Sequence, residues 1–322
     1  MRIVFMGTPE LAATVLDRLV SEKYDVVLCV TQPDKPVGRK MVLTAPPAKV
    51  KALECNIPVY QPASLRNGEA MEKIASYSPD MIVTAAYGKI LPQEMLDLPK
   101  YGCINVHGSL LPKYRGAAPV QWAILNLDKV TGVTIMKMDA GMDTGDILTS
   151  CEVPIDERVH TPELMDQLAK AGAELLIETL PKYISGQVRP VPQNNDEATM
   201  SPPITKEQGE ISWEKTAAEI CAQIRALSQW PGASTYWKGS KLKIYDAWLD
   251  PNGETLLSEY TSSHGIPAPG TVLAARKGVL AVMCKDRPLY LLEIQPASGK
   301  RMKAIDCAHN YEVGRSMEDK PS

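Results

Sequence analysis

The first half of the sequence consists of short apolar runs separated by longer amphipathic stretches. The runs cover residues 3–6, 26–31, 81–86, 103–107 and 133–138. Runs that are apolar on both faces are typical of strands that helices cover on each side. Strands that alternate with helical patterns predict βαβ units and a parallel sheet. We therefore expect an α/β fold for this part of the chain.

Prolines mark the start of the first helix and the end of the first domain. Thr8 is expected to cap the helix that follows the first strand, with Pro9 at its first position. A helical stretch over about residues 161–184 closes a domain that we place at residues 1–189. The Pro-rich, polar residues 190–207 are typical of a linker between domains.

The remaining residues, 208–322, follow a different pattern. One amphipathic helix precedes several short β-type runs with turn signals between them. This succession predicts a small barrel or sandwich. A length of 322 residues is sufficient for two such domains.

Composition argues against several classes of protein. The seven cysteines include no C-x-x-C pair, which disfavours a zinc site and a disulfide framework. No apolar run has the length of a membrane helix or of a signal peptide, so we expect a protein of the reducing cytoplasm. With a net charge of −3, a nucleic-acid partner would need a local basic patch. Neither a G-x-G-x-x-G turn nor a P-loop is present, which disfavours dinucleotide and ATP binding.

Asn105 and His107 are the first candidates for catalysis. They stand two apart on an expected strand, so alternation places both on one face at its carboxyl end. Ligands bind at that end in open α/β sheets. An amide that stabilises an oxyanion beside an imidazole that moves a proton suits acyl transfer. The alternative is a polar strand end with a structural histidine; the apolar loop 108–112 that follows argues against an ordinary surface turn.

The second candidate is the Asp- and Gly-rich loop 138–146, which includes Asp143. Such a loop can bring a carboxylate back over the sheet. Its spacing does not match an EF-hand, so calcium is disfavoured and no metal is expected. A plain hairpin loop with favourable turn residues remains the alternative.

The third candidate is the long connection 32–47, which includes Lys35, Arg39 and Lys40. Between Asp34 and Lys51 the chain has five basic residues and one acidic residue. Long connections at the carboxyl end of a sheet are often functional, and basic ones bind nucleic-acid phosphates. A solvated connection remains the alternative.

These segments together resemble the folate-dependent formyltransferase family. The resemblance rests on Asn105-x-His107-x-Ser109-Leu110-Leu111-Pro112, on the loop around Asp143 and on the basic connection, and it extends over essentially the whole chain. It implies a Rossmann-like formyltransferase domain followed by an OB-like β-barrel, and an Asn–His–Asp active site on Asn105, His107 and Asp143. It further implies 10-formyltetrahydrofolate as formyl donor, bound at Ser109, Leu110, Leu111 and Pro112.

The resemblance also implies a particular acceptor. The chain is most similar in pattern to those members of the family that formylate the amino group of methionyl initiator tRNA, with Arg39, Lys35 and Lys40 on the tRNA. Two other activities share the same chemistry: formylation of a nucleotide-linked amino sugar, and hydrolysis of the formyl folate. A tRNA-binding module without catalysis is the alternative of another class, but it would not need the Asn–His–Asp residues.

Overall fold

The structure, a computed structural model, describes residues 1–38, 40–66, 68–249, 253–276 and 278–317. The chain forms two compact units. Unit 1 consists of Met1–Val120, Val130–Ile155 and Glu163–Pro203, and unit 2 of Gln121–Lys129, Asp156–Pro162 and Ile204–Ser322. No helix within the described ranges has the length and apolar character needed to span a membrane.

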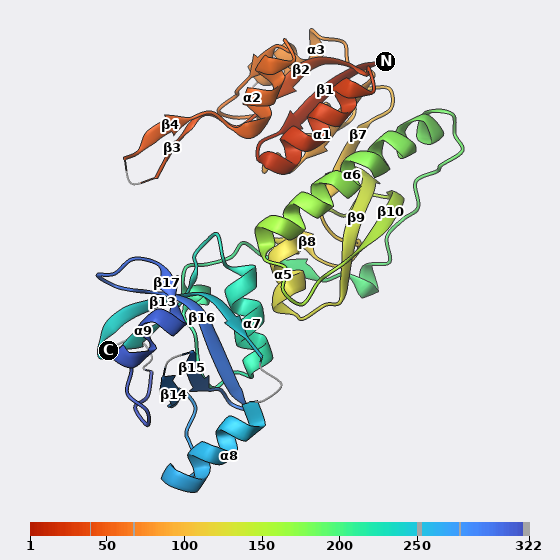
Figure 1. Ribbon diagram of the computed structural model, residues 1–322. Coiled ribbons are helices and arrows are strands. Elements are labelled where there is room, and N and C mark those ends of the chain that lie inside the picture. Colours follow the sequence, from red (N-terminus) through yellow and green to blue (C-terminus); the bar gives the residue numbers. More distant parts are fainter. Residues whose placement is uncertain (39, 67, 250–252, 277, 318–322) are drawn as a thin grey trace. The chain divides into compact units, whose positions relative to one another are not determined.

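Unit 1 contains a seven-stranded sheet (Figure 1). In order across the sheet, the strands are β10 (Ile147–Pro154), β9 (Val130–Lys137), β7 (Cys103–His107), β6 (Met81–Ala85), β1 (Arg2–Gly7), β2 (Asp25–Val30) and β5 (Val59–Tyr60). The five strands from β7 to β5 are parallel, which confirms the expected α/β sheet.

The direction of β9 differs from the sequence prediction. β9 pairs antiparallel with β7, so that Asn105 lies opposite Met136 and His107 opposite Thr134. β10 then pairs antiparallel with β9 at the edge of the sheet. The prediction was wrong because an apolar run that is buried on both faces looks the same in either direction.

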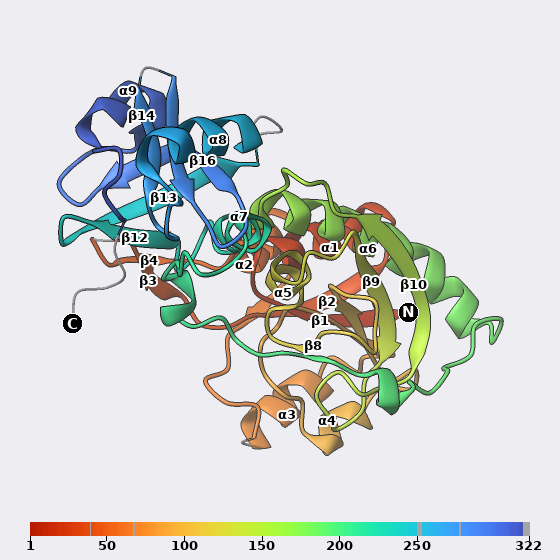
Figure 2. The same ribbon diagram turned by 90° about the horizontal axis from the view of Figure 1, so that it is seen from below.

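Helices cover both faces of this sheet (Figure 2). The helices of the first half are α1 (Glu10–Ser21), α2 (Pro47–Glu54), α3 (Gly68–Ala75), α4 (Gln93–Leu96), α5 (Pro119–Leu125) and α6 (Thr161–Ile184). On one face, Ile74 of α3 and Met95 of α4 join Val4 and Met6 of β1 in one buried cluster. On the other face, α6 approaches the sheet closely at Gly172, where a Cβ atom would lie 2.8 Å from Val106.

The start of α1 does not use the expected cap. Pro9 is the N-cap, and no side chain caps this end. The Thr8 hydroxyl instead donates to the carbonyl of Tyr87 and accepts from the backbone N–H of Gln32, both at 3.4 Å. Thr8 therefore joins the segments that leave β1, β2 and β6, and the prediction of a helix cap was wrong.

Two small pieces of β structure, separate from the seven-stranded sheet, form in segments expected to be irregular. The connection 32–47 contains a β-hairpin of β3 (Lys35–Val37) and β4 (Val42–Thr44). The segment expected to be a linker begins with a bridge between Val191 and Ile147. It continues through the 3-10 turn Asn195–Glu197 to β11 (Met200–Ser201), which pairs with β8 (Arg115–Gly116). Residues 191–201 thus pack as part of unit 1.

Unit 2 is built on a six-stranded antiparallel sheet, in line with the small β domain expected from the sequence. Its strands are β12 (Ala233–Trp237), β13 (Ser240–Trp248), β14 (Val272–Arg276), β15 (Val279–Met283), β16 (Pro288–Pro296) and β17 (Met302–Lys303). Its helices are α7 (Ala217–Ala226), α8 (Gly253–His264) and α9 (Ala304–Cys307), with short 3-10 turns at Glu207–Gly209 and Ala308–Asn310. A capping box between Thr216 and Glu219 begins α7, whose Ile220 and Ile224 join the core of the sheet.

Candidate active site

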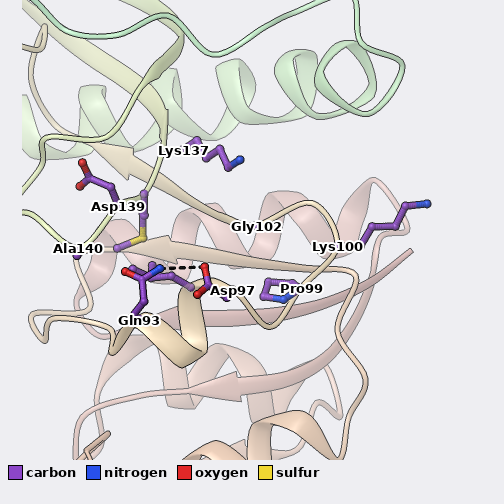
Figure 3. Close-up of a pocket in the computed structure, with 10 residues that line it drawn as sticks. Gln93, Asp97, Pro99, Lys100, Gly102, Lys137, Asp139 and Ala140 are labelled. Carbon is purple, nitrogen blue, oxygen red and sulfur yellow. Dashed lines mark hydrogen bonds between the residues drawn. The ribbon is translucent and has the colours of Figure 1, made fainter.

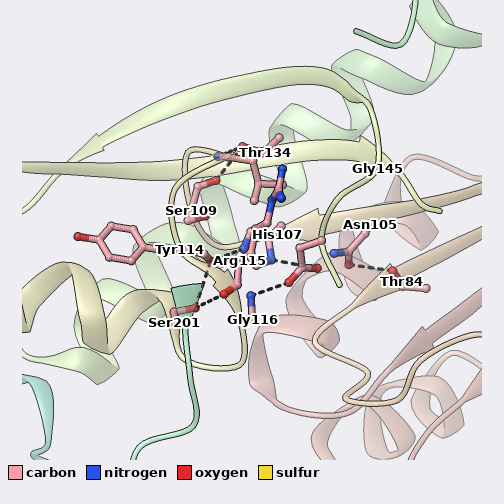
Figure 4. A network of polar contacts seen from close by, with 12 residues as sticks. Thr84, Asn105, His107, Ser109, Tyr114, Arg115, Gly116, Thr134, Gly145 and Ser201 are labelled. Carbon is pink, nitrogen blue, oxygen red and sulfur yellow. Dashed lines mark hydrogen bonds and ion pairs between the residues drawn. The ribbon is translucent and has the colours of Figure 1, made fainter. Parts of the chain in front are cut away.

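Asn105 and His107 lie on β7, as the sequence predicts, and Asn105 is oriented by a neighbouring strand. The hydroxyl of Thr84 on β6 donates to Asn105 Oδ1 at 2.8 Å (Figure 4). Because this bond occupies the amide oxygen, the amide nitrogen is the end left to donate to another group. An amide held in this way suits an oxygen atom that gains negative charge.

The imidazole of His107 is buried, and a backbone carbonyl determines its tautomer. Only 6% of the residue is exposed, and Nε2 lies 3.0 Å from the carbonyl oxygen of Tyr114. Since a carbonyl oxygen only accepts, the contact assigns the proton of the neutral ring to Nε2. The lone pair is then on Nδ1, which lies 3.7 Å from Asp143 Oδ1. This separation is too long for a direct hydrogen bond but short enough for the carboxylate to stabilise a charged imidazole.

Asp143 reaches His107 from the connection between β9 and β10. The loop 138–146 begins beside Cys103, whose carbonyl accepts from the Met138 N–H at 2.8 Å. Asp143 nevertheless faces His107, four residues further along β7. Its Oδ2 atom accepts from the backbone N–H of Gly116 at 2.8 Å. The structure thus brings together all three residues that the sequence singles out for catalysis.

The Ser109–Pro112 loop follows β7, and two hydrogen bonds with Thr134 hold its backbone. The hydroxyl of Thr134 on β9 donates to the Ser109 carbonyl at 2.7 Å and accepts from the Leu111 N–H at 3.0 Å. Ser109 and Leu111 are buried, whereas Leu110 and Pro112 are partly exposed. The exposed members are therefore the ones available to a ligand.

Two polar residues to which the sequence analysis assigns no role support the loop of Asp143. Arg115 is buried, and its guanidinium donates to Gln193 Oε1 and to Asn195 Oδ1. The Gln193 amide nitrogen donates in turn to the carbonyls of Asp143 and Gly145. Contacts between residues 48 to 80 positions apart leave no local pattern in the sequence. Only the polarity of residues 193–195 within a Pro-rich stretch is visible there.

A hollow of about 300 Å³ lies beside the first residues of the same loop (Figure 3). Met138, Asp139 and Ala140 line it on one side, and residues from α4 to Gly102 line it on the other. The Asp139 carboxylate accepts from the Gly141 N–H and the Thr144 hydroxyl at 3.0 and 2.7 Å. Both hydrogen bonds lie within the loop, so the Asp139 carboxylate stabilises the conformation of the loop.

The basic residues expected to contact nucleic acid fall on the β3–β4 hairpin. Lys35 begins β3 and Lys40 lies in the turn, and both are exposed. Arg39 lies outside the described residues. The hairpin also exposes apolar side chains, with Met41 and Leu43 each about two-thirds exposed. Below it, Lys49 and the amide of Gln61 hold the carboxylate of Asp34, each at 2.9 Å.

Metal ligands were not expected from the sequence. Within the ranges that the structure describes, no group of three or more His, Cys, Asp or Glu side chains could hold a metal ion.

Comparison with models of known protein families identifies the family to which this chain belongs. The sequence model described as "Formyl transferase" matches residues 1–180, and that of "Formyl transferase, C-terminal domain" matches residues 203–312. The chain belongs to the formyl transferase family.

Its curated relatives include several methionyl-tRNA formyltransferases. That of Caldanaerobacter subterraneus is 48% identical over 321 residues, which cover 99% of this chain and 100% of the relative. That of Halalkalibacterium halodurans is 47% identical over 307 residues, which cover 95% and 93%.

Solved structures support the fold. A sugar 3N-formyl transferase, WlaRD, matches with a TM-score of 0.64 at 20% identity over 93% of this chain and 99% of its own. HypX from Aquifex aeolicus in complex with tetrahydrofolic acid matches with a TM-score of 0.61 at 18% identity over 95% of this chain, which spans about half the length of HypX. The methionyl-tRNA formyltransferase from Clostridium thermocellum matches with a TM-score of 0.54 at 19% identity, over 78% of this chain and 94% of its own.

Proposed function

We propose that this protein transfers the formyl group of 10-formyltetrahydrofolate to the free amino group of methionyl initiator tRNA, in the cytoplasm. Two full-length relatives named methionyl-tRNA formyltransferase, at 47 and 48% identity, support the acceptor. The observation that carries the chemistry is the meeting of Asn105, His107 and Asp143 at one end of β7.

The reaction needs an unprotonated amine, an electrophilic formyl carbon and a group that moves one proton from the amine to the leaving nitrogen. Free α-amino groups titrate at about 7.7–8.0, so about a fifth to a third of the acceptor is already neutral at about pH 7.4. The amine nitrogen bonds to the formyl carbon, and the carbonyl electron pair moves to oxygen, where the amide N–H of Asn105 donates to it. The carbon–nitrogen bond to the folate then breaks, and the leaving nitrogen takes up a proton.

His107 and Asp143 handle the proton that the amine loses. The lone pair on His107 Nδ1 accepts it, and the carboxylate of Asp143 at 3.7 Å stabilises the imidazolium so formed. The same proton is then available to the leaving nitrogen.

We propose that the folate donor binds at the end of the sheet where these three residues meet. Leu110 and Pro112 offer the accessible apolar surface of the loop that follows β7, while buried Ser109 and Leu111 maintain its shape. All four sequence-predicted folate residues therefore remain assigned to the donor, with direct contact allotted to Leu110 and Pro112.

We propose that the tRNA acceptor binds to the β3–β4 hairpin, through Lys35, Lys40 and Arg39, which lies next to Lys40 in the sequence. Cations bind phosphates, and exposed apolar side chains such as Met41 and Leu43 pack against bases or sugars. A merely solvated connection would not expose so many apolar groups.

The direct test is to incubate the protein with 10-formyltetrahydrofolate and methionine-charged initiator tRNA, and then to hydrolyse the tRNA and assay for formylmethionine. A parallel reaction offers a dTDP-linked amino sugar, and a third contains the folate alone. Formylmethionine in the first reaction only is expected. A product only with the amino sugar, or only deformylated folate, would assign the chain to one of the other two activities.

A further inference from the structure

Residues 191–201 wrap across the part of unit 1 that contains the catalytic residues; we call this segment the strap. It is anchored at one end by two backbone hydrogen bonds between Val191 and Ile147, at 2.8 and 2.9 Å. At the other end β11 pairs with β8. A tether with no role beyond joining two domains would not need such contacts.

Gln193 makes the central contacts of the strap. Its side-chain nitrogen donates one hydrogen bond to the carbonyl of Asp143 at 2.8 Å and another to the carbonyl of Gly145 at 2.7 Å. Its side-chain oxygen accepts from Arg115 Nε and Nη2, at 3.1 and 2.8 Å. Both donors and the acceptor of the amide are thus in use, which is a set that neither a carboxylate nor a thioether of similar size reproduces.

The backbone that Gln193 holds is one that would not keep this conformation readily by itself. Asp143 has a φ of +54°, in the left-handed region that disfavours residues with a Cβ atom, although Asp tolerates it better than most. The bonds from Gln193 hold the carbonyl of Asp143 itself and that of Gly145, two residues later. Together with the bond from Gly116 N–H to Oδ2 at 2.8 Å, they fix the direction of the carboxylate toward His107.

The far end of the strap is linked to His107, the other member of the His–Asp pair, through the backbone carbonyl of Tyr114. The Ser201 hydroxyl lies 3.1 Å from the carbonyls of both Tyr114 and Arg115. The Tyr114 carbonyl is also the acceptor for His107 Nε2. Gly116 fits beneath the strap only because it lacks a side chain, since a Cβ atom there would lie 2.9 Å from the Ser201 carbonyl oxygen.

We propose that Gln193 is a positioning residue for formyl transfer, which holds the Asp143 carboxylate in place while Arg115 holds Gln193. This inference rests on the proposed function, because Asp143 matters for turnover only if the His–Asp pair moves the proton. The strap, which lies outside both the seven-stranded sheet and the loops that connect its strands, would thus help to position the Asp143 carboxylate for catalysis.

The main experiment is steady-state formylation by Gln193→Glu in the full-length chain. Glutamate keeps the size of the side chain and an acceptor for Arg115, but it turns two donors into oxygens that face two carbonyls. Displacing a catalytic group by about 1 Å lowers rates by up to about 10²-fold, so we expect kcat to fall between about 10- and 100-fold. The KM values for folate and tRNA should stay within about twofold, because Gln193 has no assigned contact with either substrate. The matched control is Gln187→Glu, the same chemical change at an exposed position just before the strap.

A double-variant cycle separates positioning from general structural support. In an Asp143→Asn background, Gln193→Glu should lower kcat by less than about twofold, because residues that act through one another are not additive. An equal loss in both backgrounds would overturn the inference, as would wild-type kcat in Gln193→Glu. If Gln193→Glu does not fold by circular dichroism, Gln193→Met replaces it under the same criteria. A wild-type chain that produces no formylmethionine would overturn the proposed function instead, before any variant is compared.

Discussion

At the residue scale, the role of Asn105 is the simplest to test. Replacing Asn105 by Ala removes the amide donor to the developing oxyanion, and the loss of one such donor lowers turnover by about 10²–10³-fold. Folate affinity should change little, because the bond strengthens only in the transition state. The measurement is kcat for formylation beside the dissociation constant of the folate. Near-normal turnover in Asn105→Ala would exclude the oxyanion role.

Thr84 provides a second test of the same amide. Its hydroxyl donates to Asn105 Oδ1, so Thr84→Val should allow the amide to rotate and present its oxygen to the substrate. We expect kcat to fall by about tenfold, roughly the value of one hydrogen bond of about 1.4 kcal/mol. The matched control is Thr179→Val, another buried threonine in unit 1, whose hydroxyl donates within α6. Equal kcat values in the two variants would argue against orientation by Thr84.

Tyr87 tests the cost of a polar atom in the core of unit 1. Among the described residues its buried hydroxyl has no hydrogen-bond partner, and burial raises its pKa to about 12. Tyr87→Phe should therefore leave the melting temperature unchanged or raise it. Tyr183→Phe should lower it, by the equivalent of about 1 kcal/mol, because that hydroxyl donates to the carbonyl of Tyr101 at 3.1 Å. A marked loss of stability in Tyr87→Phe would show that a bound water satisfies the hydroxyl.

At the scale of elements, the sequence predicted what depends on local pattern. β1, β2, β6 and β7 are short and largely apolar, and each lies where the sequence places a strand. The placement of Asn105 and His107 on the same face of β7 followed from the alternation of side chains along a strand. The sequence could not predict features that depend on partners far along the chain. The antiparallel direction of β9 and the hydrogen bonds from Gln193 to the loop of Asp143 are two such features. The edge strand β10 was missed because its burial is mixed and it lacks a long apolar run.

The base of the β3–β4 hairpin should show a pH dependence of known sign. Hydrogen bonds from Lys49 and then from Gln61 hold the pKa of Asp34 below its usual value. A carboxyl group whose pKa is lower in the folded state stabilises the fold above its unfolded pKa, about 3.9, and loses this effect as the pH falls through the folded value. The melting temperature of the wild type should therefore exceed that of Asp34→Asn by a constant amount between pH 8 and 5. The difference should shrink below about pH 4, and a difference that grows there would contradict the assignment.

At the scale of the whole molecule, the cysteines report on burial in both units. All seven are free; five are buried, and Cys55 and Cys151 are partly exposed. Burial raises the pKa of the Cys29 and Cys103 thiols to about 12 and that of Cys221 to about 11. Because the thiolate is the reactive form, a disulfide reagent at pH 8 should label Cys55 and Cys151 first and reach the other five only after unfolding. Mass spectrometry of the labelled peptides would identify them, and early labelling of Cys29 or Cys103 would contradict the burial of these strands.

The extent of the first domain follows from the strap and can be tested by truncation. The domain bounds that we propose from the sequence end at residue 189, and the family model of the first domain ends at residue 180. Unit 1, however, continues to Pro203 and includes Gln193 and β11. A fragment of residues 1–203 keeps the bonds that hold the loop of Asp143, whereas a fragment of residues 1–190 leaves the carbonyls of Asp143 and Gly145 without them.

We therefore expect the longer fragment to have the higher melting temperature and the higher affinity for a formyl folate. Both fragments should bind tRNA more weakly than the full chain, because they lack the sheet of unit 2 and, with it, the extended surface that small β domains offer to nucleic acids. Calorimetry and folate titration of the two fragments, side by side with the full chain, provide the comparison. If the fragments melt together and bind folate equally, residues 191–201 are a tether after all, and the precision of the His–Asp pair comes from the β9–β10 loop alone.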